Sequence, residues 1–169
     1  MRGRRRLAPR PLTTEGFAPY GDVVSSAGRG GRSINAGTSV RVEMPEPDLL
    51  EHDGRPSLSV FRASAVRLPL EVRELERHRL GSQTFLPLGG TPFVVVVALG
   101  DDAPDDGTLT AFLVDGRCGI TFRRGTWHHP LLALADGDFA VIERRGPEID
   151  CEVAGLRPAA WTLEAPGES

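Results

Sequence analysis

Three of the four histidines in this chain fall in two short segments whose residue types could build one polar pocket. His78 lies in the segment 74–90, and His128 and His129 lie in the segment 119–132. Neutral imidazole is the commonest metal ligand in proteins and the usual general acid or base near pH 7. Both segments have the pattern of strand, turn and strand. We therefore expect them to converge on one site.

The first segment places three ionisable side chains at alternate positions. Residues two apart in a strand share a face, so Glu74, Glu76 and His78 can point together. A hairpin turn near Gly81 would then bring Gln83 alongside them. A core tolerates two carboxylates and an imidazole only if they are paired or bound to metal, so this pattern predicts a polar site. The alternative is an exposed helical turn or edge strand whose charges face water.

The second segment delivers an imidazole to a strand directly after a turn at Gly125. Neighbouring residues of a strand face opposite sides, so at most one of His128 and His129 can line a given pocket. We assign that place to His128 and expect His129 to be a bystander. Trp127 is expected to be a pocket wall or a core anchor. The alternative interpretation is a surface turn around a half-buried tryptophan.

The elements that must position these residues are many short strands. Runs rich in Val, Phe, Leu and Thr alternate with Gly and Asp turn signals, which predicts an all-β sandwich or small barrel. Helix is expected only as a turn that starts at Thr13 or Thr14, and the segment Ser25–Pro47 is expected to be a loop with one irregular strand near Ser39–Val42. The predicted strands are Leu58–Ala63, Thr84–Leu88, Phe93–Leu99, Thr108–Val114, Ile120–Phe122, Leu131–Leu134, Phe139–Ile142 and Ala160–Leu163.

Length and charge limit the class of protein. The chain has 169 residues and a formal net charge of −3, which fits one domain, expected over residues 7–165, and gives no field to attract nucleic acid or anionic lipid. The Arg-rich start, residues 1–6, is expected to be a disordered basic tail. No apolar run approaches the roughly 18 residues that span a membrane. Cys118 and Cys151 are far apart and form no CxxC motif, which suits a cytoplasmic protein.

Lysine is absent from the sequence, so all 20 basic residues are arginine. Schiff-base chemistry and pyridoxal phosphate (PLP) attachment both need a lysine amine, and both are therefore excluded within this chain. A substrate carboxylate must instead meet arginine, backbone N–H groups, histidine or a metal.

The two segments together resemble the two motifs of the cupin superfamily, His-x-His-(three or four)-Glu and Gly-x-x-His. Glu76 and His78 stand at the two histidines of the first motif, Gln83 at its glutamate, and His128 at the second-motif histidine. Two of the four positions depart from the usual ligand set. One carboxylate, one amide and two imidazoles could still hold a divalent metal, less tightly than three imidazoles would.

A closer resemblance, to the ureidoglycolate lyase family (formerly ureidoglycolate hydrolase), runs from about Leu7 to Leu156. Family members usually have a Tyr-His pair at Phe122-Arg123 and an Asp-Arg-Gly-Gly-like stretch at 143–146. The loop Arg32–Asp48 also matches the family poorly. If these positions contact substrate, the substrate specificity could differ from that of the family. The motifs that carry the resemblance are Tyr20-Gly21-Asp22-Val23, Glu74–His78 with Gly81-Ser82-Gln83, Phe93–Leu99 with Gly100-Asp101-Asp102, and Trp127-His128-His129-Pro130.

This resemblance implies a homodimeric lyase that cleaves the small ureido acid (S)-ureidoglycolate to glyoxylate and urea in allantoin degradation. The reaction needs no NAD and no PLP, and a divalent metal, nickel or manganese, could assist it. Two alternatives are another metal-dependent cupin enzyme, such as an oxygenase or isomerase, and a non-catalytic cupin that binds a small acid. The expected catalytic residues and metal ligands are Glu76, His78, Gln83 and His128; the expected substrate-binding residues are Arg62, with Arg77 as the alternate carboxylate clamp, and Trp127.

Overall fold

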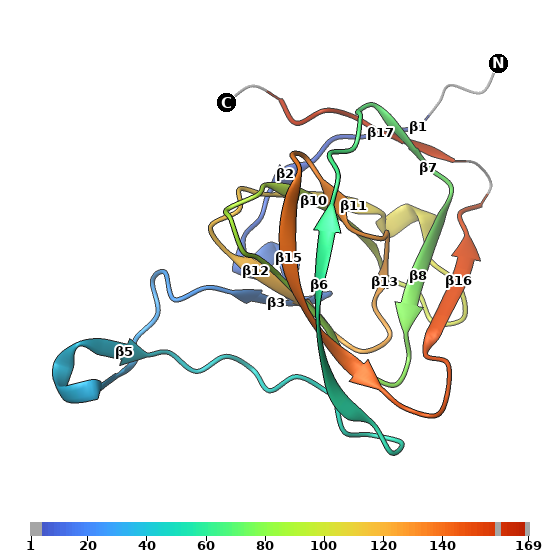
Figure 1. Ribbon diagram of the computed structural model, residues 1–169. Coiled ribbons are helices and arrows are strands. Elements are labelled where there is room, and N and C mark those ends of the chain that lie inside the picture. Colours follow the sequence, from blue (N-terminus) through green and yellow to red (C-terminus); the bar gives the residue numbers. More distant parts are fainter. Residues whose placement is uncertain (1–4, 158–159, 168–169) are drawn as a thin grey trace.

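The protein is nearly all β in its computed structural model, which describes residues 5–157 and 160–167 (Figure 1). Two large sheets face each other, and a small third sheet covers the outer side of the first. The first sheet has the order β16 (Cys151–Gly155), β8 (Glu74–His78), β13 (Trp127–His128), β10 (Phe93–Ala98), β11 (Thr110–Val114) and β2 (Arg10–Pro11), with β14 (Leu132–Ala133) also on β10.

The facing sheet has the order β3 (Gly21–Val24), β12 (Gly119–Phe122), β9 (Gln83–Pro87), β15 (Gly137–Arg145) and β6 (Arg55–Ala63). The small sheet joins β1 (Arg5–Leu7), β17 (Trp161–Leu163) and β7 (Leu70–Val72), while β4 (Arg32–Ile34) pairs only with β5 (Ser39–Arg41). The all-β prediction is confirmed, and the architecture is that of a cupin-like sandwich.

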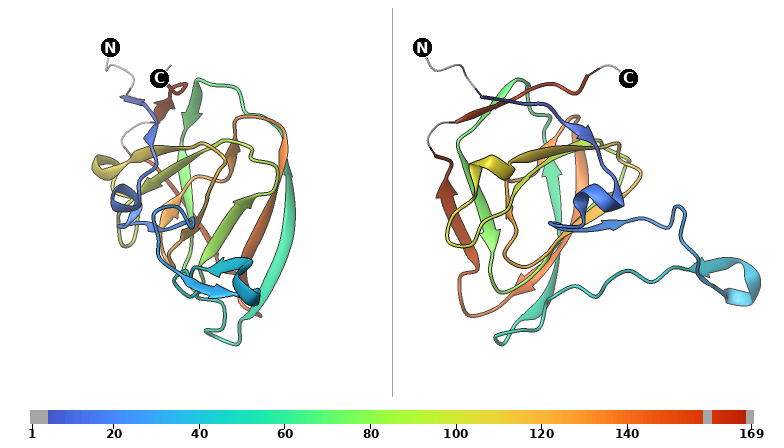
Figure 2. Two further views of the ribbon diagram at one scale, coloured as in Figure 1. Left: turned by 90° about the vertical axis from the view of Figure 1, so that its left-hand side faces the viewer. Right: turned by 180° about the vertical axis from the view of Figure 1, so that it is seen from behind.

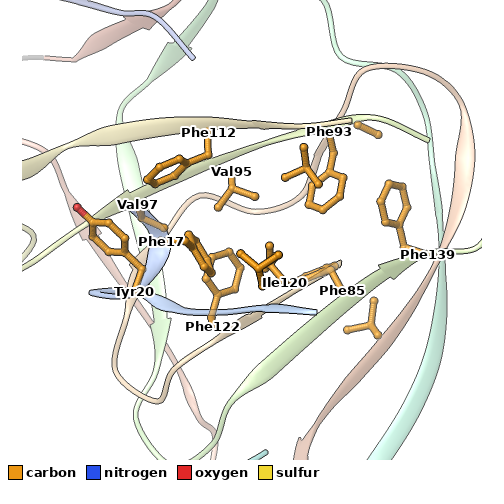
Figure 3. Close-up of a cluster of buried hydrophobic side chains, with 14 residues drawn as sticks. Phe17, Tyr20, Phe85, Phe93, Val95, Val97, Phe112, Ile120, Phe122 and Phe139 are labelled. Atoms are coloured by element: carbon orange, nitrogen blue, oxygen red, sulfur yellow. The ribbon is translucent and has the colours of Figure 1, made fainter. Parts of the chain in front are cut away.

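The strand β10 shows how the sequence builds these layers. All six of its residues are buried, because the strand is covered on both faces. Phe93, Val95 and Val97 point into the main core between the two large sheets (Figure 3). Val94 and Val96 point into a second core beneath the small sheet. The apolar run thus serves two cores at once.

All eight predicted strands coincide with observed strands, although their ends differ by a few residues. The short helix α1 (Thr14–Phe17) is also confirmed, and the side chain of Thr13 caps it by accepting from the backbone N–H of Gly16 at 3.0 Å. The helical alternative for residues 70–78 is wrong, because this segment forms the strands β7 and β8. The edge alternative holds for β7, which lies at the edge of the small sheet, but not for β8, which lies between β16 and β13.

Three connections cross from one large sheet to the other at the same end of the sandwich. They join β8 to β9, β12 to β13 and β15 to β16. The expected hairpin near Gly81 is therefore corrected, since β9 does not pair with β8 and belongs to the facing sheet. Gly125 makes the second crossing with φ of 81°, a left-handed conformation that suits glycine, and its N–H donates to the carbonyl of His78 at 2.7 Å.

The basic N-terminus is only partly a tail. Residues 1–4 of the expected tail lie outside the described residues. Arg5 and Arg6 belong to β1, which pairs in parallel with β17, and Arg6 forms an ion pair with Glu164 at 2.9 Å. Strand pairing therefore includes the last two residues that were assigned to the tail.

The segment between β3 and β6 projects away from the sheets as an arm (Figures 1 and 2). It carries the β4–β5 hairpin and the 3₁₀ turn η1 (Asn35–Gly37), and no residue from 25 to 50 is buried. A second 3₁₀ turn, η2 (Asp106–Thr108), precedes β11. No helix in residues 5–157 and 160–167 is long and apolar enough to cross a membrane.

Candidate active site

The crossings bring Glu76, His78 and His128 into one cluster on the inner face of the first sheet. One donor atom from each lies within 4.8 Å of the others. The strands explain this, because His128 on β13 is the direct partner of Glu76 on β8, and His78 follows two residues along β8. His128 is 1 % exposed, and the two imidazole rings are 5.5 Å apart between centroids. The predicted convergence of the two segments is confirmed for these three residues.

Backbone carbonyls set the tautomer of both imidazoles. Nδ1 of His78 lies 3.1 Å from the carbonyl oxygen of Asp150, and Nδ1 of His128 lies 2.9 Å from that of Thr126. A carbonyl only accepts, so each Nδ1 carries a proton, and either ring in its neutral form has its lone pair at Nε2. Both Nε2 atoms are buried and lack a hydrogen-bond partner among the described residues.

The facing sheet contributes Gln83, Phe122 and Glu143. Gln83 on β9 pairs directly with Phe122 on β12 and with Glu143 on β15, and directly paired residues share a face. The ring of Phe122, which belongs to the main core (Figure 3), stacks on His128 at 4.1 Å with an interplanar angle of 15°. The amide nitrogen of Gln83 donates to Glu143 Oε2 at 2.8 Å, and its Oε1 is buried without a partner among the described groups.

Cys151 lies at the open side of this cluster. It is the direct partner of His78 on the neighbouring strand β16, and its Sγ lies 3.6 Å from Glu76 Oε2. The thiol is exposed and also lines a surface hollow of about 390 Å³, in which Arg79 is the basic side chain. The side chain of Glu76 is itself 22 % exposed. Solvent therefore reaches the carboxylate of the cluster, and Cys151, which contacts that carboxylate, also lines the hollow.

The groups of the cluster perturb one another. His128, whose Nε2 approaches Glu76 Oε1 to 3.6 Å, is the main cause that holds the pKa of Glu76 below its ordinary 4.5, against the opposing effect of burial. Burial and then the neighbouring His128 lower the pKa of His78 below 6.5, so its ring is neutral near pH 7. Burial and the charge of Glu76 raise the pKa of the Cys151 thiol, which therefore keeps its proton.

This donor set fits a divalent cation. Two imidazole lone pairs and a carboxylate that face one another repel unless a proton or a cation lies among them. Histidine ligands of metals commonly donate their other ring N–H to a backbone carbonyl, as both rings do here. Two imidazoles and one carboxylate form a known ligand set for divalent metals, and the amide oxygen of Gln83 would be a further donor.

Arg77 and Trp127 lie on the opposite face of the first sheet from the cluster. Trp127 is fully buried in the second core, and the Arg77 guanidinium sits 4.3 Å above its ring. Arg77 also donates to Glu152 at 2.8 Å and to the carbonyl of Asp101. Alternation along β8 explains this placement, because Arg77 stands between Glu76 and His78. The expectation that Arg77 lines the pocket is therefore corrected. Of the two expectations for Trp127, the core anchor is confirmed and the pocket wall is wrong.

Arg62 does not reach the cluster either. Its side chain is 91 % exposed on the outer face of β6, with Nε 3.7 Å from Asp138. Asp138 precedes Glu143 by five residues along β15, which is about 17 Å of strand. The expectation that Arg62 binds the substrate carboxylate at this site is therefore corrected. His129, the expected bystander, is not in the cluster, and its Nδ1 lies 2.9 Å from the carbonyl of Pro130.

Three residues of this end of the sandwich were not predicted as site residues. Phe122 and Glu143 were considered only as differences from the family pattern, and Cys151 only as a cysteine. A usable signal existed for Glu143, because alternation continues the buried positions of Phe139 and Val141 to a carboxylate at the end of the same strand face. No comparable signal marks Cys151, since the strand β16 itself was not predicted.

Comparison with known proteins agrees with this architecture. Residues 4–164 match the family described as ureidoglycolate lyase. A ureidoglycolate lyase of Pseudomonas entomophila is 44 % identical over 150 residues, which cover 88 % of this chain and 90 % of that protein. Proteins with the same name from Pseudomonas aeruginosa and Pseudomonas syringae pv. tomato are 43 % and 41 % identical, each over 88 % of this chain and over 89 % and 88 % of their own lengths.

Proposed function

The chain belongs to the ureidoglycolate lyase family, and from that premise we propose that it cleaves (S)-ureidoglycolate to glyoxylate and urea, a step of allantoin degradation. The observation that carries the proposal is the pair of unpartnered imidazole nitrogens beside Glu76, at the end of the sandwich where the sheets cross. The reaction needs a base for the substrate hydroxyl, an acid for the departing urea nitrogen and a cation for the carboxylate.

The metal of this site is proposed to be nickel or manganese, held by Glu76, His78, Gln83 and His128. Such an ion, when bound, lowers the pKa of a hydroxyl that coordinates it. The protein contributes rigidity to this donor set. His128 is held between the Phe122 ring and the Thr126 carbonyl, so its Nε2 cannot turn away from Glu76.

We assign the proton transfers to groups on the open side of the cluster. Because Nε2 of His78 would be a ligand of the ion, the hydroxyl proton can pass instead to Glu76 Oε2, the carboxylate oxygen that faces Cys151, as the carbonyl of glyoxylate forms. The C–N bond breaks with its electron pair on nitrogen, and the protonated thiol of Cys151 can supply the proton that urea needs. Return of the hydroxyl proton from Glu76 Oε2 to the Cys151 thiolate, 3.6 Å away, then resets the site. Neither step requires a redox cofactor or a lysine.

Arg79 replaces Arg62 and Arg77 as the proposed partner of the substrate carboxylate. It lines the hollow beside Cys151, its side chain is 57 % exposed, and its Nε donates to Glu152 at 2.7 Å. A guanidinium can bind a carboxylate through two parallel hydrogen bonds.

Incubation of the purified protein with racemic ureidoglycolate and Mn²⁺ or Ni²⁺ tests the proposed reaction. We expect glyoxylate and urea to appear in equal amounts and well above the spontaneous rate, until half of the racemate is consumed. Glyoxylate release at the spontaneous rate with either metal present would refute the lyase proposal. The alternatives, another cupin enzyme or an acid-binding cupin, predict no urea above the spontaneous rate.

A homodimer is part of the proposal. The edge strand β6 exposes Leu58 and Val60, at 73 % and 59 %, next to the arm that has no buried residue from 25 to 50. A long apolar edge strand invites pairing with another chain. Light scattering should give twice the 18.2 kDa chain mass for the native protein and a lower mass for Leu58→Glu combined with Val60→Glu. We also propose a cytoplasmic location, which the two free cysteines support.

A further inference from the structure

Gln83 and Glu143 form a side-chain hydrogen bond across the facing sheet, beside Phe122, whose ring stacks on His128 of the cluster. The two residues are direct partners on β9 and β15, and the Gln83 amide nitrogen donates to Glu143 Oε2 at 2.8 Å. Gln83 is 6 % exposed, so water cannot readily substitute for this contact. Its other amide atom, Oε1, is buried without a partner in the described structure.

The orientation of a glutamine amide decides whether it can serve a cation. The oxygen carries two lone pairs, whereas the nitrogen carries two donor hydrogens and no accessible lone pair. A half-turn about the last side-chain bond exchanges them with almost no change in shape. A buried glutamine among metal donors therefore needs a neighbour that accepts hydrogen bonds only. An ionised carboxylate satisfies this condition, because it accepts a hydrogen bond from the amide nitrogen and repels the amide oxygen.

We propose that Glu143 is a positioning residue that holds the Gln83 amide with its oxygen toward Glu76, His78 and His128. Glu143 is outside the three-residue donor cluster and acts on a cation through Gln83. The inference rests on the metal part of the proposed function and deepens it. It explains how an amide can occupy a position where the cupin motif has a carboxylate, because the negative charge is kept one strand away and fixes the amide dipole.

Mn²⁺ binding to metal-free protein, followed by electron paramagnetic resonance of the unbound ion, tests the role of Glu143 without substrate. Glu143→Gln removes the exclusive acceptor and lets the Gln83 amide turn. We expect affinity to fall about 10- to 100-fold, the range seen when the outer partners of metal ligands are removed. Glu148→Gln is the matched control, because it removes the same charge from the lining of the hollow, and it should change affinity less than threefold.

A double exchange separates orientation from misfolding. In Gln83→Glu combined with Glu143→Gln the amide and carboxylate change places, so the amide can donate to one carboxylate oxygen and leave the other for the cation. We expect this variant to bind Mn²⁺ at least as tightly as the native protein, although it carries the same change at position 143.

Four results would overturn the inference: native affinity in Glu143→Gln, an equal loss in Glu148→Gln, no recovery in the double exchange, or no Mn²⁺ binding by the native protein. A different result would refute the lyase proposal. A protein that shows the expected binding pattern but releases no glyoxylate would refute the reaction and leave the role of Glu143 intact.

Discussion

Arg77→Met distinguishes a structural role for Arg77 from the substrate-binding role that the sequence suggested. The guanidinium lies 4.3 Å above the fully buried Trp127 and donates to the Asp101 carbonyl. A desolvated cation–π contact contributes about 2 kcal/mol, and a hydrogen bond from a charged donor contributes about 1.5–3 kcal/mol. The guanidinium no longer has to be desolvated in the variant, which offsets part of this sum. Methionine preserves most of the packing over the tryptophan ring.

We therefore expect the free energy of unfolding to fall by about 2 kcal/mol, since the contributions above exceed the offset. For a chain of this size such a loss lowers the midpoint of thermal unfolding by about 4–8 °C. Urea unfolding and a thermal melt measure both quantities. Below the transition, kcat and KM for ureidoglycolate should be unchanged, because Arg77 and the cluster lie on opposite faces of β8.

Arg79→Met is the matched control for this experiment. Arg79 is half exposed and lines the hollow, so its loss should raise KM while stability changes by less than about 1 kcal/mol. A raised KM with native stability in Arg77→Met would refute the placement of Arg77 and restore it as a substrate ligand.

Three further outcomes follow from the cluster. His128→Ala and Gln83→Ala should each lower glyoxylate release to near the spontaneous rate with cooperative unfolding retained; full activity in both would remove the site assignment. Cys151→Ser should lower kcat more than it changes KM, and an unchanged kcat would exclude the thiol as the acid. The pKa values of His78 and Glu76 are lowered, which means that folding favours neutral imidazole and ionised carboxylate. Metal-free protein should therefore lose stability as the pH falls below about 6.5, and further below about 4.5. A urea unfolding midpoint that does not change between pH 7.5 and 4 would contradict this.

The sequence was most informative where periodicity and turn signals agree. The run at 93–98 and the Asp-Gly turns predicted strands that the structure contains, and the helical start at Thr13 was correct because a side-chain cap is a local interaction. The two histidine segments were also correctly expected to meet. The strand and cap predictions need only local geometry and the rule that alternate strand residues share a face. The meeting of the two histidine segments was instead inferred from their shared residue types and from their resemblance to the two cupin motifs.

The sequence was less informative where the answer depends on which strands pair. A hairpin near Gly81 and a crossing to the facing sheet have the same local pattern, and only the long-range partners of β8 and β9 distinguish them. Arg62 and Arg77 failed as substrate ligands for the same reason. A strand pattern shows that Arg77 faces away from Glu76. It does not show that Arg77 contacts the buried Trp127 and Glu152 on that side of the sheet.

Removal and return of the metal tests the central claim most directly. Protein treated with a chelator should release glyoxylate from ureidoglycolate at the spontaneous rate, and activity should return in proportion to added Mn²⁺ or Ni²⁺ and level off at one ion per chain. His128→Ala should bind neither ion tightly and recover no activity. Full turnover in excess chelator would contradict the account, because the paired imidazole nitrogens beside Glu76 would then not hold a catalytic metal.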